Sequence, residues 1–352
     1  MSYTNGLDNP ELYFQTKLYT GNAGTLAVTL DGDTDMQPDL VWGKGRAVAT
    51  PNALFDSVRG ATKYLEADRN VAEATVANSL TSFDSDGFTL GADTSTVINY
   101  SQLMVAWCWK AGGSASSNTD GSITSSVSAN TTAGFSIVKY TGAGVGTTTT
   151  IGHGLGGVPE MYIVKSLDSV GNWQTYHHKM SSAPETDYIQ LDTTEAVADY
   201  TFWGDTAPTS TVFTVKDGND VNESGEEFIA YCFRSIKGYS KFGSYTGGSD
   251  PFVYLGFKPA FVMFKNASAT ENWRIVDNKR DVDNPVVQHL YPNLSAAEGS
   301  GASYNDFVDF LSNGFKIRSG SGEIDGSGNT IIYMAFSEAP FVSSSGVPNN
   351  AR

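Results

Sequence analysis

The stretch Pro-Glu-Met-Tyr-Ile-Val-Lys at residues 159–165 occurs in three versions, and this recurrence decides the fold. The other two versions are Pro-Asp-Leu-Val-Trp-Gly-Lys at residues 38–44 and Pro-Ala-Phe-Val-Met-Phe-Lys at residues 259–265. A continuous apolar run of this length predicts a strand that is covered on both faces. The steps from Pro38 to Pro159 and from Pro159 to Pro259 are 121 and 100 residues, which is too long for the short units of a solenoid.

The same landmarks flank each version of this stretch. A Tyr-Thr-Gly triplet precedes it, at residues 19–21, 140–142 and 245–247. A second apolar run follows it, at residues 105–109, 229–233 and 332–336. Phe88, Phe213 and Phe315 mark a further strand, and Asp-Gly or Asn-Gly turns introduce two of these strands at Gly87 and Gly314. We therefore predict an all-β protein with minor helix, built from three tandem antiparallel β-sandwich or jelly-roll-like repeats of about 100 residues.

One segment of repeat 1 departs from the strand pattern. Within residues 62–79, apolar side chains such as Tyr64, Leu65 and Val76 have a spacing that fits one face of a helix. The counterpart in repeat 3, residues 286–298, is interrupted by Pro292. We therefore predict a short helix in repeat 1, and only short helical turns that are common to all repeats.

The division of the chain follows from these landmarks. The expected parts are repeat 1 at residues 1–112, a Ser/Thr/Gly-rich linker or joining strand at 113–134, repeat 2 at 135–236, repeat 3 at 237–341 and a polar C-terminal tail at 342–352. Only residues 236–238 join repeats 2 and 3, so these two repeats are expected to pack against each other.

Charge and composition exclude several classes of function. The formal net charge is −16 and no short basic cluster stands out, which argues against binding to nucleic acid or to anionic membranes. The first residues carry no signal-peptide pattern and no apolar stretch approaches membrane-spanning length, so we expect no membrane insertion and synthesis in a cytoplasm. Cys108 and Cys232 fall at equivalent places where repeat 3 has Ala335, which predicts two buried free thiols.

Motifs of nucleotide-binding and metal-binding proteins occur only in incomplete form. Gly-x-Gly-x-x-Gly at residues 152–157 precedes a proline and a strand, whereas a dinucleotide site requires a helix at this place, so we interpret the motif as a turn. Asp31, Asp33 and Asp35 resemble the start of a calcium loop, but Met36 stands where glycine is required. An acidic hairpin tip is the preferred interpretation, and a looser Ca²⁺ site is the alternative.

The remaining candidates concern enzymes and sugar binding. The four histidines lack the spacing of a zinc site, and paired carboxylates along the chain carry no evidence of glycosidase geometry, so we expect no enzyme, no metal and no cofactor. Asn172-Trp173 and Asn272-Trp273 recur at equivalent places. A tryptophan beside an amide can stack on a sugar ring, which makes these four residues weak candidates for glycan contact. The alternative, which we prefer, is a tryptophan of the core or its rim.

Several phrases of the chain resemble a family of virion proteins of tailed bacteriophages, especially marine phages that infect cyanobacteria and similar hosts. These phrases are the Tyr-Thr-Gly triplets, Gly-Leu-Gly-Gly-Val-Pro at 154–159, Gly-Tyr-Ser-Lys-Phe-Gly-Ser-Tyr-Thr-Gly at 238–247, Asn-Gly-Phe-Lys at 313–316 and the ending Val-Pro-Asn-Asn-Ala-Arg. The likeness covers essentially the whole chain. It implies a tail-fibre-like protein and supplies no catalytic or binding residues.

The sequence supports three hypotheses about function. The first is a structural protein of the virion in a tail fibre or adhesin, which assembles with other virion proteins as a homo-oligomer and presents its repeats to a host-surface glycan. The second is a capsid decoration or head-fibre protein with a purely structural role, and the third, least favoured, is a polysaccharide-degrading enzyme. Features that all three repeats share indicate scaffold, so recognition is expected in parts that only one or two repeats possess.

Overall fold

The computed structural model describes residues 7–93, 98–248, 250–300 and 307–348. Nearly every element in these ranges is a β-strand and all named strand pairs are antiparallel, which confirms the predicted all-β class. None of the helices in the described ranges is long and apolar enough to cross a membrane. We divide the strands into three modules, which are β1–β9, β10–β19 and β20–β28.

Module 1 consists of a large sheet and a small sheet. In spatial order the large sheet contains β1 (Phe14–Thr20), β9 (Leu103–Trp109), β3 (Leu40–Gly45), β4 (Ala53–Asp56), β5 (Lys63–Glu66) and β6 (Ala74–Thr75). The small sheet contains β2 (Leu26–Val28), β8 (Gly87–Leu90) and β7 (Leu80–Asp84). The short 3-10 helix η1 (Pro10–Leu12) precedes β1.

Module 2 has the largest sheet of the protein. In spatial order it contains β10 (Ser116–Asn118), β11 (Ser125–Asn130), β12 (Phe135–Thr141), β19 (Glu227–Phe233), β14 (Met161–Ser166), β15 (Gln174–His177), β16 (Asp187–Gln190) and β17 (Ala198–Asp199). A second sheet pairs β13 (Thr149–Gly152) with β18 (Val212–Val215). The helices η2 (Thr201–Trp203) and α1 (Asn219–Asn222) lie on either side of β18 in sequence.

Module 3 repeats this plan with shorter sheets. The main sheet contains β20 (Ser240–Thr246), β28 (Thr330–Pro340), β22 (Phe257–Asn266) and β23 (Arg274–Asp277). Two further sheets contain β21 (Phe252–Tyr254), β27 (Gly314–Ser319) and β26 (Phe307–Leu311), and β24 (Gln288–His289) with β25 (Gly299–Ser300). The helix α2 (Gly322–Asp325) follows β27.

The main sheets share one strand order. The strand that carries Tyr-Thr-Gly pairs with the closing strand, the closing strand pairs with the proline-led strand, and the proline-led strand pairs with the strand that follows it. The register is also shared, since the first residue of each apolar run lies opposite the last aromatic residue of the closing strand. These pairs are Leu40 with Trp109, Met161 with Phe233, and Phe261 with Phe336. The expected Asp-Gly and Asn-Gly hairpins form at β7–β8 and β26–β27.

The main sheets bury both of their faces. One face in modules 1 and 3 packs on the small sheet and forms a separate core. The other face contributes to a single cluster that draws buried residues from all three modules. At its centre the last aromatic residues of the closing strands meet, since the ring of Phe336 lies 5.7 Å from Trp109 and 6.2 Å from Phe233.

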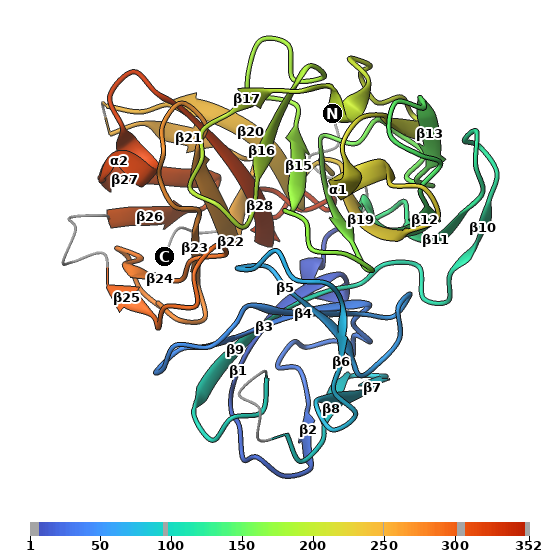
Figure 1. Cartoon of the computed structure of the whole chain (residues 1–352). Coiled ribbons are helices and arrows are strands. Elements are labelled where there is room, and N and C mark those ends of the chain that lie inside the picture. The colour runs from blue at the N-terminus through green and yellow to red at the C-terminus, as the bar shows by residue number, and fades with distance from the viewer. Residues whose placement is uncertain (1–6, 94–97, 249, 301–306, 349–352) are drawn as a thin grey trace.

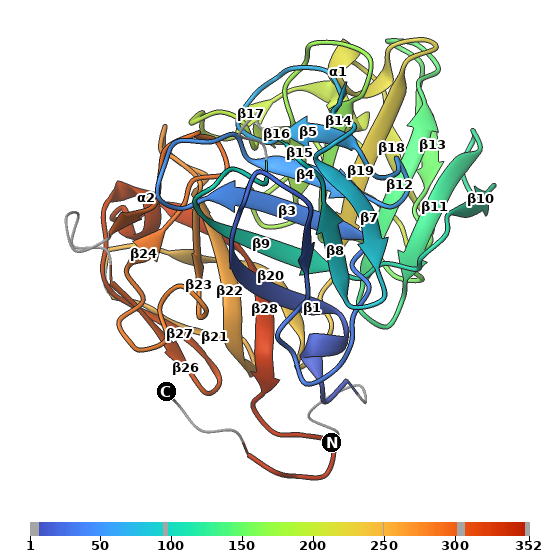
Figure 2. The same ribbon diagram turned by 90° about the horizontal axis from the view of Figure 1, so that it is seen from below.

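The modules are therefore arranged round a shared core. Figure 1 shows them as three lobes, blue, green to yellow, and orange to red, gathered round one centre. Figure 2, the view from below, shows β1 of module 1 beside β28 of module 3. The ring of Phe14 on β1 stacks there on Phe336 of β28, with 5.1 Å between the ring centres.

Two segments lie outside this shared plan. The predicted helix at residues 62–79 is wrong, because Lys63–Glu66 forms β5 against β4 and the chain then turns. Turn-forming Asp68 and Asn70 interrupt the apolar pattern there, and Asp68 accepts a hydrogen bond from the amide of Asn52 at 2.6 Å. Within residues 113–134, β10 and β11 extend the sheet beyond β12, whereas β1 and β20 lie at the edge of their sheets.

Candidate functional site

The tryptophans of the two Asn-Trp pairs lie between modules, not on the surface. Trp173 is fully buried and its indole nitrogen donates to the carbonyl oxygens of Glu66 and Arg69 in module 1, at 2.9 and 3.2 Å. Trp273 is 1% exposed and donates to the carbonyl oxygen of Gln190 in module 2, at 2.8 Å. Neither ring has a free face on which a sugar could stack, so both tryptophans are core residues, which is the interpretation that we preferred.

The asparagines of these pairs are half-buried neighbours of the same junctions. Asn272 donates to a carboxylate oxygen of Glu323 at 3.0 Å, and its own carbonyl oxygen accepts from Asn293 at 2.9 Å. Asn172 is likewise partly covered beside Trp173. The side-chain amide of Asn272 is therefore engaged within module 3.

Module 1 has Asn52 at the position that is equivalent to Trp173 of module 2 and Trp273 of module 3. Asn52 precedes β4 as Trp173 precedes β15 and Trp273 precedes β23, and it is fully buried. Its side-chain nitrogen donates to the carbonyl oxygens of Tyr291 and Leu294 in module 3, both at 3.0 Å. Module 1 therefore inserts into module 3, as module 2 inserts into module 1 and module 3 into module 2. The three junctions, which we call the 1–2, 2–3 and 1–3 seams, close a ring.

Backbone hydrogen bonds join each seam at equivalent residues. In the 1–2 seam the amide of Glu73 donates to the carbonyl of Leu167 at 2.9 Å. In the 2–3 seam the amide of Val197 donates to Ala267 at 2.9 Å, and in the 1–3 seam the amide of Glu298 donates to Arg46 at 2.8 Å. In each seam the residue that donates this backbone hydrogen bond lies seven residues after the residue whose carbonyl oxygen accepts from the inserted side chain. These pairs are Glu66 and Glu73, Gln190 and Val197, and Tyr291 and Glu298. One backbone arrangement thus serves all three seams.

The lysine that ends each apolar run is also part of this arrangement. Lys44, Lys165 and Lys265 are fully buried, and burial lowers the pKa of each to about 8. The ammonium of Lys265 donates to the carbonyl of Thr194 across the 2–3 seam at 3.2 Å and to that of Asn266 at 2.7 Å. Such contacts to carbonyl oxygens satisfy the donors of a buried ammonium group.

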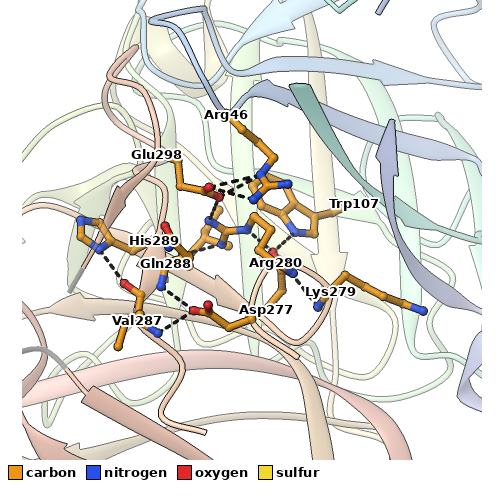
Figure 3. A network of polar contacts seen from close by, with 11 residues as sticks. Arg46, Trp107, Asp277, Lys279, Arg280, Val287, Gln288, His289 and Glu298 are labelled. Carbon is orange, nitrogen blue, oxygen red and sulfur yellow. Dashed lines mark hydrogen bonds and ion pairs between the residues drawn. The ribbon is translucent and has the colours of Figure 1, made fainter. Parts of the chain in front are cut away.

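A buried ionic network fills the 1–3 seam, as Figure 3 shows. The guanidinium of Arg280 donates to the carboxylates of Asp277 at 2.6 Å and of Glu298 at 3.1 Å. Arg46 of module 1 donates to the other oxygen of Glu298 at 2.9 Å, and the indole of Trp107 donates to Asp277 at 3.0 Å. The side chains of Asp277 and Arg280 are fully buried.

The 1–2 seam contains the same network with other partners. Arg59 is bound to Asp56 and donates to Glu73 at 3.1 Å. The hydroxyl of Tyr231 in module 2 donates to Asp56 at 2.8 Å, in the position that Trp107 has in the 1–3 seam. Aspartate and arginine are spaced i, i+3 in both networks, because the turn after the strand brings the guanidinium back to the carboxylate.

Uncharged side chains occupy the equivalent positions of the 2–3 seam. His177 stands at the position of Asp56 and Asp277, and the next equivalent residues are Met180 and Val197. One ring nitrogen of His177 lies 3.3 Å from the carbonyl oxygen of Tyr333 in module 3. Burial, together with neighbouring His178, lowers the pKa of His177 to about 3, so its imidazole is neutral at pH 7.

The chemistry of the seams is that of a scaffold. Each carboxylate and guanidinium of the networks is held by a specific partner, and its side chain is at most 17% exposed, so these groups serve to join the modules. Both cysteines are free and buried as predicted, and burial raises the pKa of their thiols. Of the calcium-loop candidates, Asp31 is paired with Lys17. Within the described ranges no group of three or more His, Cys, Asp or Glu side chains is placed to hold a metal ion.

The spacing Asp-x-x-Arg is a sequence signal for these networks, and the predicted site residues do not include it. It follows the strand after the proline-led run at residues 56–59 and 277–280, and repeat 2 has His-x-x-Met at 177–180. The recurrence of a spaced acid and base at equivalent places predicts a paired charge. The partners Tyr231 and Trp107 come from another module, and only the fold brings them there.

Comparison with curated proteins finds no significant match. A family model, described as a domain of unknown function (DUF7483), matches residues 9–340. This range includes all three modules and all three seams, which agrees with a body that is joined by one core. The chain therefore belongs to the DUF7483 family.

Proposed function

We propose that this chain is a structural component of a tailed-phage virion, in a tail fibre or adhesin that attaches to a host-surface glycan. It assembles there with other virion proteins and as a homo-oligomer. The resemblance of its recurring phrases to phage virion proteins supports this origin. The buried polar groups of the seams support a scaffold role, because their geometry positions modules and leaves their outer loops for recognition.

The closed ring of seams is the observation that carries the proposal. Each module inserts Asn52, Trp173 or Trp273 into its neighbour, and each seam adds backbone hydrogen bonds. Three modules that are fixed in this way present their loops in one geometry. A preorganised surface loses less conformational entropy on binding, which favours adhesion to a repetitive glycan.

The same observation favours one alternative, a capsid decoration or head-fibre protein. Three equivalent modules round one centre give the body an approximate threefold arrangement, seen in Figure 1. A body of this kind fits a threefold position on a symmetric particle. In that case the chain would contact the capsid and no receptor.

Labelling of intact particles distinguishes the two locations. Antibody against the purified chain, viewed by electron microscopy, should mark the tail if the protein is a fibre, and the head if it decorates the capsid. Purified chain should also block phage adsorption in a concentration-dependent way if it is the adhesin. Head labelling without competition at saturating protein would refute the adhesin, and absence of label from purified particles would refute a virion component altogether.

A further inference from the structure

An open depression lies in the 2–3 seam between β20 and the corner of module 2. Its volume is about 650 Å³, within the range of small-molecule sites. The titratable side chains that line it are Glu160, His178, Lys179, Lys237, Lys241 and Tyr333. Three lysines face one glutamate here, in a chain whose net charge is −16. A local excess of positive charge in a hollow attracts anions selectively.

The equivalent hollow in the 1–3 seam shows that the scaffold does not require a cation at the place of Lys241. It is smaller, about 210 Å³, and lies between β1 and the corner of module 3. Gln15 stands there in place of Lys241, since each lies opposite an equivalent residue of the closing strand, Cys108 or Ala335. Glu338 also lines that hollow and is paired with Lys258 at 2.9 Å. Of these two hollows, the one in the 2–3 seam therefore has the positive lining.

The groups of the 2–3 hollow are held in place by the fold. Glu160 accepts from the amide of Ser235 at 3.0 Å, and one ring nitrogen of His178 lies 3.1 Å from the carbonyl oxygen of Phe242. Tyr333 forms part of the wall beside Gly243, where a Cβ atom would come within 2.5 Å of the Tyr333 hydroxyl oxygen. Glycine at this position therefore keeps the phenol where it is.

An exposed aromatic strip continues the hollow along β21. Phe252 and Tyr254 are 48% and 53% exposed, and the residue between them, Val253, is buried, so both rings lie on the outer face of the strand. All six tryptophans of the chain are buried, which makes two neighbouring exposed rings unusual for this protein. Lys241 connects the two features, because its ammonium donates to the carbonyl of Tyr254 at 2.6 Å and lies 5.7 Å from the centre of that ring.

We propose that the hollow and the strip together, which we call the Lys241 cleft, bind an acidic oligosaccharide. A sugar ring stacks on Tyr254 or Phe252, and its carboxylate or phosphate lies between Lys179 and Lys241. The hydroxyl of Ser244, an exposed residue of the lining, is available to a sugar hydroxyl. This inference rests on the proposed function, for which it names the ligand class.

Calorimetric titration of the full chain tests the site with three probes, an oligogalacturonate, a phosphorylated oligomannose and neutral maltohexaose. We expect saturable binding of an acidic probe that weakens with added salt, and none of maltohexaose. Preference for one acidic probe identifies the carboxylate or the phosphate as the ligand group. Absence of binding by both acidic probes, or equal binding of the neutral one, would overturn the proposal.

Matched variants locate the site. Lys179→Gln and Lys241→Gln should each raise the Kd about 10-fold, since a charge-assisted contact is worth about 1.5 kcal/mol. Tyr254→Ala tests the stacking without disturbing a buried residue. Lys279→Gln is the control, because Lys279 occupies the place of Lys179 in the 1–3 seam and is also exposed. An equal effect of Lys279→Gln would mean that general charge, and not the cleft, binds the probe.

Adsorption competition separates failure of this inference from failure of the proposed function. If the wild-type chain and Lys241→Gln block phage adsorption equally well, the chain is an adhesin that does not use the Lys241 cleft. If the wild-type chain binds the acidic probe and does not block adsorption, the cleft is real and the adhesin role is wrong. If the wild-type chain blocks adsorption and Lys241→Gln does not, the result supports both the Lys241 cleft and the adhesin function.

Discussion

The single variant Arg280→Met should destabilise the protein more than the double variant Asp277→Asn, Arg280→Met, in which the charge of Asp277 is also removed. Arg280→Met leaves the Asp277 carboxylate fully buried, with hydrogen bonds from Trp107 and nearby amides in place of the cation. Loss of one partner of a buried pair costs about 3–5 kcal/mol. The free energy of unfolding should fall by that amount at pH 7.

The double variant Asp277→Asn, Arg280→Met should lose less, about 1–3 kcal/mol, because both charges are removed while the indole N–H of Trp107 loses its carboxylate acceptor. An asparagine oxygen can still accept from the amides that Asp277 binds, those of Lys279 at 3.1 Å and of residue 280 at 2.9 Å. The chain itself provides the precedent, since Met180 occupies the equivalent place in the 2–3 seam and is buried. Together with the single variant Asp277→Asn, these proteins form a double-mutant cycle. The interaction energy between residues 277 and 280 that this cycle measures should therefore exceed about 2 kcal/mol.

Urea unfolding followed by tryptophan fluorescence measures these differences, provided that the slope with urea stays unchanged. Lys139→Met is the control, because Lys139 pairs with Glu227 at 2.8 Å while the two side chains are 27% and 45% exposed, and a solvent-accessible pair contributes at most about 1 kcal/mol. A double variant as unstable as Arg280→Met would refute this account of the 1–3 seam. Arg280→Met behaving like the control would refute it as well.

Three further predictions concern other parts of the seams. Burial lowers the pKa of His177 to about 3, so the unfolded state binds more protons below pH 6.5 and stability is lost as the pH falls. His177→Asn should retain about 2–3 kcal/mol more of its neutral-pH stability at pH 4.5, and an unchanged acid profile would contradict this. Burial lowers the pKa of Lys265 to about 8, so between pH 8 and 10 the unfolded state again binds more protons. Lys265 should therefore add about 1 kcal/mol per pH unit to the slope of stability with pH in this range, and Lys265→Met should lack that contribution, as the difference between the urea midpoints of the two proteins will show. Trp273→Ala should cost about 3–5 kcal/mol and speed hydrogen exchange at the amides of Val197 and Glu271 in the 2–3 seam, and uniformly faster exchange over the whole chain would count against local opening.

The strands of the main sheets were predictable because their signals are local. An apolar run led by proline, such as residues 159–165, and a turn before Phe315 each specify a short element from neighbouring residues. The helix at residues 62–79 was wrong because its residues serve two different neighbours, a strand partner in β4 and the inserted Trp173. Over a short stretch, the spacing of apolar residues is the same whether they face two different neighbours or form one face of a helix.

The seams were not predictable because their contacts link residues that are far apart in sequence. The indole of Trp173 reaches carbonyl oxygens more than one hundred residues earlier, and Asn52 reaches residues more than two hundred later. The sequence shows that Trp173 and Trp273 recur, which favours a core residue but is also compatible with a sugar platform. Only their burial decides between the two.

The difference in charge between two seams explains why the Lys241 cleft is positive. Glu338 in the lining of the 1–3 hollow has the uncharged counterpart Ser235 in the 2–3 hollow, and Gln15 has the cationic counterpart Lys241. The buried acids Asp277 and Glu298 also have uncharged counterparts, but so do their partners Arg280 and Arg46, so that network leaves the difference in charge unaffected. Lys179 and Lys279 occupy equivalent places, so the lysine is common to both seams and the nearby carboxylates are not. The backbone hydrogen bonds, which are equivalent in every seam, carry the joining of the modules. Side chains at the seams can therefore differ without separating the modules, and where its hollow opens to solvent the 2–3 seam has Lys241 and Ser235 in place of Gln15 and Glu338.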